Sequence, residues 1–384
     1  MSSEEIKKEL RQKIRLLGRG ILPPEGKKYS LTNLGVGAGP QGKKYYLYTK
    51  DGKELGMISV PLFPPDHHLA KYAIKTRRGD IPNTMITEDG VVLKGTGMPK
   101  LINLILDDGT SNVNGGFAQM HCYNTCSMVL GFKCEHFDND EECQYCEVEP
   151  IGRQHRSFPD KQVPEYMAEA LKLAIETTSV RAVTITSGTF DEPDEVARHY
   201  IKTLKEMRKI TDKPIHIQIE PLKDTNLLKE LSLYANNIGI FLEVFNEDIR
   251  RRICPGKAKI SKDKYIENWE LAVEYFGRGN VLTTCILGFG ENFNDVIDGI
   301  REFAGIGVKT AILFVRAKSD KMKDFTPSFL EIGTDELVDL HLNAADILTK
   351  NGICFKQNDE AGCLGCQGCT AMVEACDYVE NFTD

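Results

Sequence analysis

Residues 163–188 read VPEYMAEALKLAIETTSVRAVTITSG, and this stretch shows the unit from which most of the chain is built. Its first part, 163–178, has apolar residues at a spacing of about 3.6 positions, which predicts an amphipathic helix. Its second part, RAVTITSG, is short, apolar and β-branched, as is typical of a strand buried on both faces. The stretch therefore predicts a unit made of a helix followed by a buried strand.

The same pattern recurs further along the chain. Helices are expected at 193–209, 225–235, 262–277, 294–305 and 334–350, and they lead into the strands PIHIQIEP, IGIFLEVF, NVLTTCILGFG, VKTAILFVRA and ICFKQ. Another strand is expected around FAQMHC. Strands that alternate with helices predict a parallel sheet with right-handed crossovers. About six or seven βα units indicate an α/β fold, a complete or partial (β/α) barrel of the TIM type over residues 111–357, rather than a short doubly wound sheet.

The first 110 residues have a different pattern and predict a small, mostly β N-terminal region. Residues 3–17 form an expected helix with Ser3 as its cap and Gly18 at its end. KYYLYTKDGKELGMISV predicts a hairpin around Asp51–Gly52, and EDGVVL and LINLILDDG add strand-like pieces. The glycine-rich GVGAGP is expected to be a tight turn, because no clear strand precedes it and no helix follows it.

Composition narrows the classes of function. A net charge of −8 gives the chain no general attraction to nucleic acid or to anionic membranes. No apolar run approaches the roughly 20 residues of a membrane span, and the N-terminus lacks a signal-peptide pattern, so we expect a cytoplasmic protein. Twelve cysteines in such a chain point to metal rather than to disulfides, and to an anaerobic or well-reduced setting.

The first cysteine group lies in CEHFDNDEECQYC, residues 134–146, with the spacing C-x8-C-x2-C. Structural zinc normally takes four protein ligands, whereas three thiols would leave one corner of a [4Fe–4S] cluster open. An open corner suits a cluster that must bind a substrate or cofactor. In a barrel, the loops that follow the strands gather at one face and form the site, so we expect this loop there.

This loop resembles the radical S-adenosylmethionine (radical SAM) enzymes, in which a loop ending C-x-aromatic-C follows the first strand of a βα barrel. The resemblance implies that Cys134, Cys143 and Cys146 hold a [4Fe–4S] cluster and that Tyr145 lies near the adenine of S-adenosylmethionine. The first gap of eight residues departs from the commonest gap of three. Cys126 or Cys122 therefore remains an alternative to Cys134 as the first ligand.

Other segments add to the resemblance, which covers about residues 115–320. TSGTFDEP follows the second strand, where the family binds the methionine amino group, and TCILGFGE fits the family pattern GxIxGxxE except that Thr284 replaces the first glycine. Glu220 and Glu243 end the third and fourth strands, where a carboxylate suits a ribose hydroxyl or the ammonium group, or has only a structural role. The implied cofactor-binding residues besides Tyr145 are Ser187, Gly188, Thr189, Glu220, Glu243, Ile286 and Gly288.

The second cysteine group is CLGCQGCTAMVEAC, in a Cys-rich tail that we place at 358–384. Its spacing, C-x2-C-x2-C-x6-C, resembles the ferredoxin run and predicts an auxiliary [4Fe–4S] cluster held by Cys363, Cys366, Cys369 and Cys376, with zinc as the rival. Cys354, or no residue, could take the place of Cys376. If the ICFKQ strand is parallel to the others, this cluster would lie at the same face as the first. Cys122 and Cys126 are core residues or complete the auxiliary site.

The resemblance implies a cytosolic enzyme that cleaves S-adenosylmethionine to a 5′-deoxyadenosyl radical and removes hydrogen from a small molecule or cofactor precursor. Its electrons would come from a reductase or a protein of the ferredoxin or flavodoxin type, and we expect no nucleic-acid or membrane partner. The auxiliary cluster is expected to relay electrons. The alternatives are sulfur insertion from that cluster, modification of a peptide or protein side chain, and a non-catalytic iron–sulfur or zinc carrier or scaffold.

Overall fold

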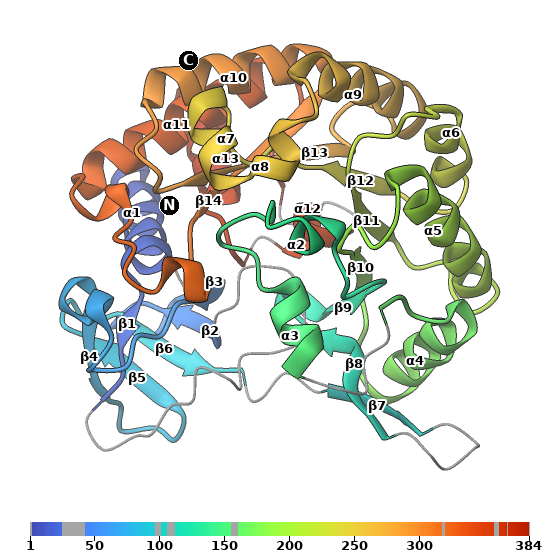
Figure 1. Ribbon diagram of the computed structural model, residues 1–384. Helices are drawn as coiled ribbons and strands as arrows, with labels where there is room; N and C mark the ends of the chain where they lie inside the picture. Colours follow the sequence, from blue (N-terminus) through green and yellow to red (C-terminus); the bar gives the residue numbers. More distant parts are fainter. Residues whose placement is uncertain are drawn as a thin grey trace.

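The computed structural model describes residues 2–24, 43–96, 101–105, 112–154, 160–316, 319–356, 361–366 and 368–383. A curved sheet with helices along its outer side forms the larger part of the molecule, and a smaller sheet lies beside it (Figure 1). GVGAGP lies outside the described residues. No helix within the described ranges is both long and apolar enough to cross a membrane.

The larger sheet has eight strands in the order β14-β13-β12-β11-β10-β9-β8-β7. The six strands from β9 to β14 pair in parallel, whereas β7 and β8 are antiparallel. Because β14 and β7 are the two edges of the sheet, the described strands form a partial barrel. The strands are β7 (Leu101–Ile105), β8 (Asn112–Met120), β9 (Thr125–Val129), β10 (Ala182–Thr186), β11 (Ile215–Ile219), β12 (Asn237–Ile240), β13 (Val281–Leu287) and β14 (Val308–Phe314).

Six long or medium helices cover the outer side of this sheet, close to the ranges that the apolar spacing predicts. Both faces of β9 and β10 are buried, which explains their continuous apolar and β-branched sequences. The prediction of alternating helices and parallel strands is confirmed. The helices are α4 (Pro164–Thr177), α5 (Pro193–Arg208), α6 (Asn226–Ser232), α9 (Lys262–Phe276), α10 (Phe293–Ile306) and α11 (Thr334–Lys350).

Two predicted strands need correction. FAQMHC falls largely in β8, which is antiparallel to its neighbour, so the first parallel strand is β9 with the sequence TCSMV. ICFKQ forms no strand in its described part, 353–356. The amide of Phe355 donates to the Cys376 sulfur at 3.2 Å. This segment therefore packs on the C-terminal helix that contains Cys376 and not on the sheet edge.

The smaller sheet comes from the N-terminal region, with the order β1-β4-β5-β6-β2-β3. The predicted hairpin is present, since β2 and β3 pair in antiparallel fashion. β7 also falls within residues 1–110 but belongs to the larger sheet. The six strands and one 3-10 turn are β1 (Ile21–Leu22), β2 (Lys43–Tyr48), β3 (Glu54–Val60), η2 (His68–Tyr72), β4 (Ile74–Arg78), β5 (Thr84–Thr87) and β6 (Val92–Gly95).

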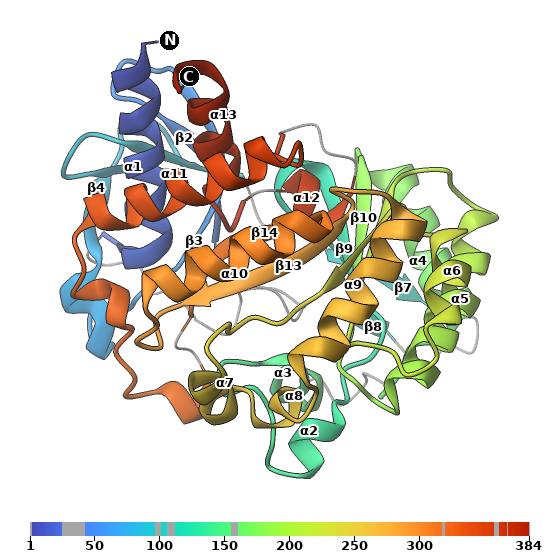
Figure 2. The ribbon, with the colours of Figure 1, turned by 90° about the horizontal axis from the view of Figure 1, so that it is seen from above.

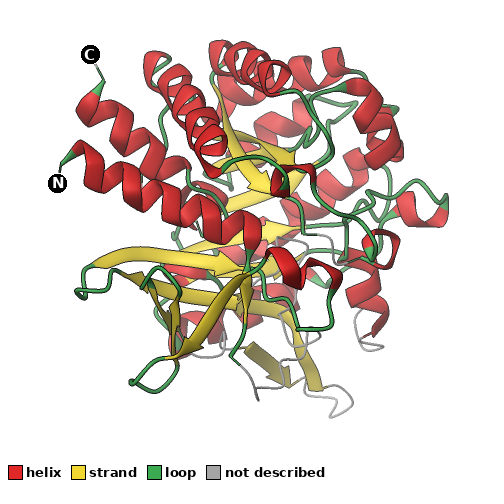
Figure 3. Cartoon of the chain, turned by 90° about the vertical axis from the view of Figure 1, so that its left-hand side faces the viewer, coloured by secondary structure: helices red, strands yellow, loops and turns green. Residues whose placement is uncertain are grey.

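The first helix, α1 (Ser3–Arg19), begins at the predicted residue and is two residues longer than predicted at its C-terminal end. Ser2, not Ser3, caps it and forms a capping box with Glu5, and Gly20 rather than Gly18 ends it. Its apolar stripe is buried, and it packs against α11 and the final helix, α13 (Met372–Phe382). Figure 3 shows these N- and C-terminal helices side by side.

Short helices lie at the carboxyl end of the parallel strands. They are α2 (Glu135–Asp138), α3 (Val148–Gln154), α7 (Glu247–Ile253) and α8 (Pro255–Ala258). Two 3-10 turns follow β14, η4 (Asp320–Met322) and η5 (Ser328–Leu330). α2 and α3 belong to the chain that follows β9, so the first cysteine group lies at the barrel face where we expected it.

The second cysteine group lies at the other end of the barrel. α12 (Gly362–Cys366) packs on β9, β10, β11 and the 3-10 turn η3 (Cys122–Asn124), which directly precedes β9. Figure 2 shows α12 on the side opposite to α2, α3, α7 and α8. Our expectation that both groups share one face was wrong, because ICFKQ does not extend the parallel sheet.

Cys376 also differs from its prediction as the fourth auxiliary ligand. Its sulfur forms a disulfide with Cys354, with 5.9 Å between the two Cα atoms. Both residues are buried, in the core that α11 and α13 share. In this arrangement neither thiol is available to a cluster built on Cys366 and Cys369.

Candidate active site

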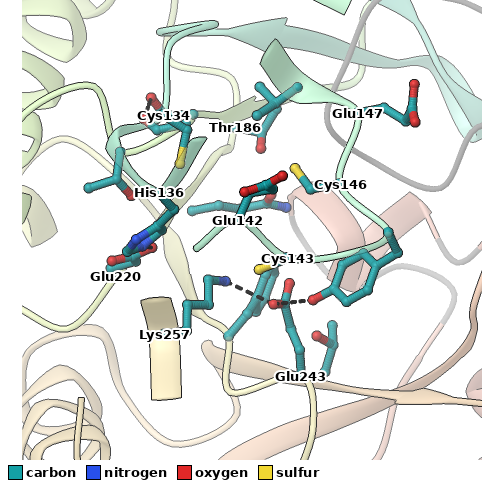
Figure 4. Close-up of a pocket in the computed structure, with 18 of the residues that line it drawn as sticks. Cys134, His136, Glu142, Cys143, Cys146, Glu147, Thr186, Glu220, Glu243 and Lys257 are labelled. Atoms are coloured by element: carbon teal, nitrogen blue, oxygen red, sulfur yellow. Dashed lines mark hydrogen bonds and ion pairs between the residues drawn. The ribbon is translucent and has the colours of Figure 1, made fainter. Parts of the chain in front are cut away.

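A cavity lies at the carboxyl ends of β10–β14 and under the loop that follows β9. The structure brings ten of the residues implied by the resemblance to its wall. Figure 4 shows the three labelled cysteines around one space, with Glu243 and Lys257 beside it. The ten residues are Cys134, Cys143, Tyr145, Cys146, Ser187, Gly188, Thr189, Glu220, Glu243 and Ile286.

The three thiols of the first group lie in surroundings that keep them protonated when no metal is bound. Burial raises the pKa of Cys134 to about 11 and also raises the pKa of Cys146. The pKa of Cys143 is raised by a hydrogen bond with the thiol of Cys254 and by burial. A metal or cluster that binds here therefore displaces protons, as thiolate ligation requires.

The two alternatives for the first ligand lie elsewhere. Cys126 is fully buried in β9, in the core between the sheet and α4 and α5. Cys122 precedes β9 and so lies at the opposite end of that strand from Cys134. Neither lines the cavity, so the geometry favours Cys134, whose role as a ligand stays a prediction.

The cysteine loop is held in place by contacts from three other segments. Glu220, just after β11, accepts a hydrogen bond from His136 with 2.9 Å between the carboxylate oxygen and Nε2. Gly256 lies so close to His136 that a Cβ at this position would be 2.2 Å from Nδ1 of the imidazole. At Gly188, a Cβ would lie 2.2 Å from the carbonyl oxygen of Lys133. Small residues and one carboxylate therefore let the loop lie close to the strand ends.

Glu220 is ionised in spite of its burial. Burial alone would raise the pKa of this carboxyl, but the hydrogen bond from His136 and the charge of Lys257 outweigh it and lower the pKa. Glu220 thus supports the loop as a negative charge. The expected contact with a ribose hydroxyl or ammonium group remains a prediction.

Glu243 is the centre of a second charged group. It has the left-handed backbone angle φ = 66°, which is uncommon for glutamate. Its carboxylate lies 2.9 Å from Nζ of Lys257 and accepts a hydrogen bond from the hydroxyl of Tyr145. Burial alone would lower the pKa of Lys257, but Glu243 and Cys143 outweigh it and raise the pKa.

Gly288 stands behind the cavity wall and does not line it. Its φ of 129° favours glycine, and a Cβ there would lie 2.6 Å from Cγ1 of Val315, which does line the cavity. Glu291 accepts hydrogen bonds from the amides of Gly288 and Phe289, at 2.6 and 2.8 Å. The glutamate of the GxIxGxxE pattern therefore fixes the turn after β13.

Sequence reasoning gave no role to two polar residues of this site, Lys257 and His136. Lys257 follows the Pro-Gly pair of α8, and His136 lies inside the cysteine loop, so each could have been noted from its position beside a motif. Arg316, after β14, also lines the cavity. Burial lowers its pKa to about 10, and its Nε and Nη1 have no hydrogen-bond partner among the described residues.

Residues 128–303 match the Radical SAM superfamily. This match runs from the end of β9 through β13 and contains the whole cysteine loop. With the partial barrel and the three clustered thiols, it places residues 128–303 in the radical SAM superfamily, whose members are enzymes. The prediction of the family is confirmed, and the non-catalytic carrier is set aside.

One curated relative is the bacteriochlorophyllide c C-7(1)-hydroxylase of Chlorobaculum limnaeum, 23% identical over 247 residues. The match covers 56% of this chain and 59% of that protein, so the chain spans about three fifths of its relative.

Two solved structures are also similar. Methylornithine synthase is 14% identical with a TM-score of 0.44, over 67% of this chain and 70% of that one. The FeFe-hydrogenase maturase HydG from Carboxydothermus hydrogenoformans is 15% identical with a TM-score of 0.45, over 59% of this chain and 52% of that one.

The cavity fits the [4Fe–4S] cluster and S-adenosylmethionine that the superfamily implies. Three thiols come from one short loop, which is one fewer than a closed cluster or zinc site takes. Gly188 lets the chain pass close to that loop, and Glu220 and Glu243 place carboxylates on the same wall. Carboxylates are suitable partners for a sulfonium cation that carries an ammonium group.

Proposed function

We propose that Cys134, Cys143 and Cys146 hold a [4Fe–4S] cluster and that S-adenosylmethionine binds in the adjoining cavity. When bound, the two supply a 5′-deoxyadenosyl radical that removes a hydrogen atom from the substrate. One observation carries this proposal. The three thiols line a single cavity together with carboxylates from the ends of two parallel strands.

The protein's own residues prepare the space for this chemistry. Glu243, Lys257 and Tyr145 form one connected group, so the charge of the carboxylate is largely balanced before a cofactor arrives. The remaining acceptor positions of Glu243 suit a hydroxyl or ammonium donor. Apolar side chains, among them Ile286, Leu313 and Val315, form much of the rest of the wall and help to exclude water.

The substrate that we propose is a small molecule or a cofactor precursor. The name of the curated relative says that it hydroxylates bacteriochlorophyllide c, a small molecule, and this supports the class of substrate without fixing its identity. Arg316 adds a buried cation to the cavity wall, which suits an acidic group on a ligand. Modification of a peptide or protein side chain remains the second candidate.

The second cysteine group is proposed to hold an auxiliary cluster that relays electrons, and sulfur donation is the alternative. Neither Cys366 nor Cys369 is among the residues that line the cavity, which supports the relay, because a sulfur donor must be within reach of the substrate radical. An external protein of the ferredoxin or flavodoxin type, or a reductase, would supply the electrons.

The central test is the formation of 5′-deoxyadenosine by the reconstituted protein. The chain is loaded with iron and sulfide under anaerobic conditions, reduced with dithionite and given S-adenosylmethionine. We expect 5′-deoxyadenosine and methionine in equal amounts. A protein that contains its full complement of iron, binds S-adenosylmethionine and yet forms no 5′-deoxyadenosine would contradict the proposal.

A further inference from the structure

A second group of thiols comes together at the end of the barrel opposite the cavity mouth. Cys122, in η3, is buried, and its thiol is hydrogen-bonded to that of Cys366 in α12. A Cβ on Gly368 would lie 2.6 Å from the Cys122 sulfur, so the lack of a side chain there lets the two segments meet. Residues that are more than 240 positions apart thus share one site.

Cys369 and His121 complete the same cluster of side chains. The thiol of Cys369 faces Cys366 and the hydroxyl of Ser59, and the imidazole of His121 is hydrogen-bonded to Cys366. The chain around them is tied together by its backbone. The amide of Ser59 donates to the carbonyl oxygen of Gly368 at 2.7 Å.

Cations surround these thiols. The positive charge of Lys44 interacts electrostatically with Cys122 and Cys369, and that of Arg316 interacts with Cys369. Arg181 donates to the carbonyl oxygens of Tyr123 and Gly365, at 3.3 and 2.9 Å, and so joins η3 to α12. Positive charge beside these thiols would offset part of the negative charge of a cluster held there.

Two hydrogen-bond donors of Arg316 have no acceptor among the described residues. Its Nη2 donates to the carbonyl oxygen of Ser59 at 3.0 Å, whereas Nε and Nη1 are inaccessible to solvent and have no partner among the described residues. Buried donors without acceptors are rare in proteins. An anionic group beside Cys369 would supply the missing acceptors.

The backbone at Cys122 is strained in the way that functional segments often are. Tyr123 and Asn124 both have left-handed angles, with φ of 52° and 57°. Specific contacts hold this conformation, since the hydroxyl of Tyr123 accepts a hydrogen bond from the amide of Met57 at 2.7 Å. The strained turn directs Cys122 toward α12, whereas Cys126 points into the core.

We propose that Cys122, Cys366 and Cys369 are ligands of a second iron–sulfur cluster, in which Cys122 takes the place that the sequence spacing gave to Cys376. In ferredoxins, a C-x2-C-x2-C run is completed by a cysteine distant in sequence. Here the run 363–369 supplies the local thiols and η3 supplies the distant one. Arg316, which also lines the cavity, would donate from its unpartnered Nε and Nη1 to the sulfur atoms of this cluster.

The site can be tested without the reaction. The background is the variant Cys134→Ala/Cys143→Ala/Cys146→Ala, which lacks the first group. After anaerobic reconstitution, its iron and acid-labile sulfide are counted, and the reduced protein is examined by electron paramagnetic resonance. We expect about four iron atoms per chain, as in one [4Fe–4S] cluster. Because this readout involves no S-adenosylmethionine, its failure is distinct from failure of the proposed function.

Single changes in this background decide which cysteine completes the site. Cys122→Ala should abolish iron binding, and Cys122→Ser should retain the fold but shift the resonance signal and lower the iron content at least threefold. Cys126→Ala and Cys376→Ala are the matched controls and should keep the iron, with circular dichroism as the check on folding. Iron retained without Cys122 but lost without Cys376 would overturn the proposal. Stoichiometric zinc without sulfide in the purified background protein would also overturn it.

Discussion

Nζ of Lys257 lies 2.9 Å from the carboxylate of Glu243, and both side chains are largely buried, with 15% and 13% of their surfaces exposed. The residues come from different elements, since Glu243 follows β12 and Lys257 lies in α8. Tyr145 of the cysteine loop completes the contact from the opposite side. This pair thus links the proposed cluster loop to the chain that follows the fourth parallel strand.

The first prediction concerns the charge of Glu243. In Glu243→Gln, Lys257 keeps its positive charge but loses its partner, and the cavity must then accept a sulfonium cation beside it. We expect the Kd of S-adenosylmethionine to rise at least about tenfold, which corresponds to about 1.4 kcal/mol, while the iron content stays the same. Equilibrium binding to the reconstituted protein measures the effect. Glu247→Gln, at an exposed position of α7, is the control, and equal affinities of the two variants would contradict the assignment.

The second prediction concerns the three thiols of the loop. Cys134→Ala/Cys143→Ala/Cys146→Ala should lower the iron content by about four atoms per chain and abolish 5′-deoxyadenosine formation. Cys126→Ala, at a fully buried position in β9, should retain both properties. If the triple variant still cleaves S-adenosylmethionine, the ligands lie elsewhere in the chain.

The third prediction concerns the turn after β13. In Gly288→Val the new side chain would collide with Val315 and Phe329 and would require a φ of 129° that valine rarely adopts. Because Val315 lines the cavity, we expect weaker binding of S-adenosylmethionine with the iron content unchanged. Gly305→Ala is the control, since a Cβ there meets nothing within 4 Å. Affinity equal to that of the unmodified protein would remove this turn from the site.

The fourth prediction concerns pH and stability. His341 in α11 is buried, and burial lowers its pKa from 6.5 to about 4. Between pH 6.5 and pH 4 the unfolded chain therefore binds a proton that the folded chain does not, so acid destabilises the fold across this window. In His341→Asn this acid-dependent loss of stability is absent, because asparagine does not titrate. Its side-chain amide can still donate to the carbonyl oxygen of Leu337.

The difference in the free energy of unfolding between the unmodified protein and His341→Asn should shrink by about 1 kcal/mol for each pH unit below 6.5. Chemical denaturation at pH 7, 6 and 5 measures this difference. Parallel pH profiles for the two proteins would show that His341 does not titrate as a buried neutral group.

The barrel and its reactive face were accessible from the sequence because both depend on local pattern. The 3.6-residue spacing of 163–178 and the β-branched strand after it define the repeating unit, and parallel strands place the loops after them at one end. The position of 134–146 follows from that topology. The partner of Cys366 could not be predicted in this way, since Cys122 is distant in sequence and reaches it only through the strained turn at Tyr123 and Asn124.

The path of the chain after α11 could also not be predicted from the sequence. ICFKQ has the composition of a strand, but tertiary contacts with α13 satisfy its backbone instead. Once that strand is lost, the second cysteine group is no longer carried to the cavity mouth. The wrong prediction of this one strand therefore placed the second cysteine group at the wrong end of the barrel.

The packing of α1 on α13 bears on how the chain folds as it is made. Lys13, with 4% of its side chain exposed, forms a 2.5 Å ion pair with Glu374, and the two residues are 361 positions apart. The part of the buried α1 stripe that faces α11 and α13 therefore stays uncovered until nearly all of the barrel has left the ribosome. Contacts so distant in sequence form slowly, and the exposed helix is meanwhile open to aggregation. Slower synthesis at low temperature, or chaperone co-expression, should accordingly raise the yield of folded protein.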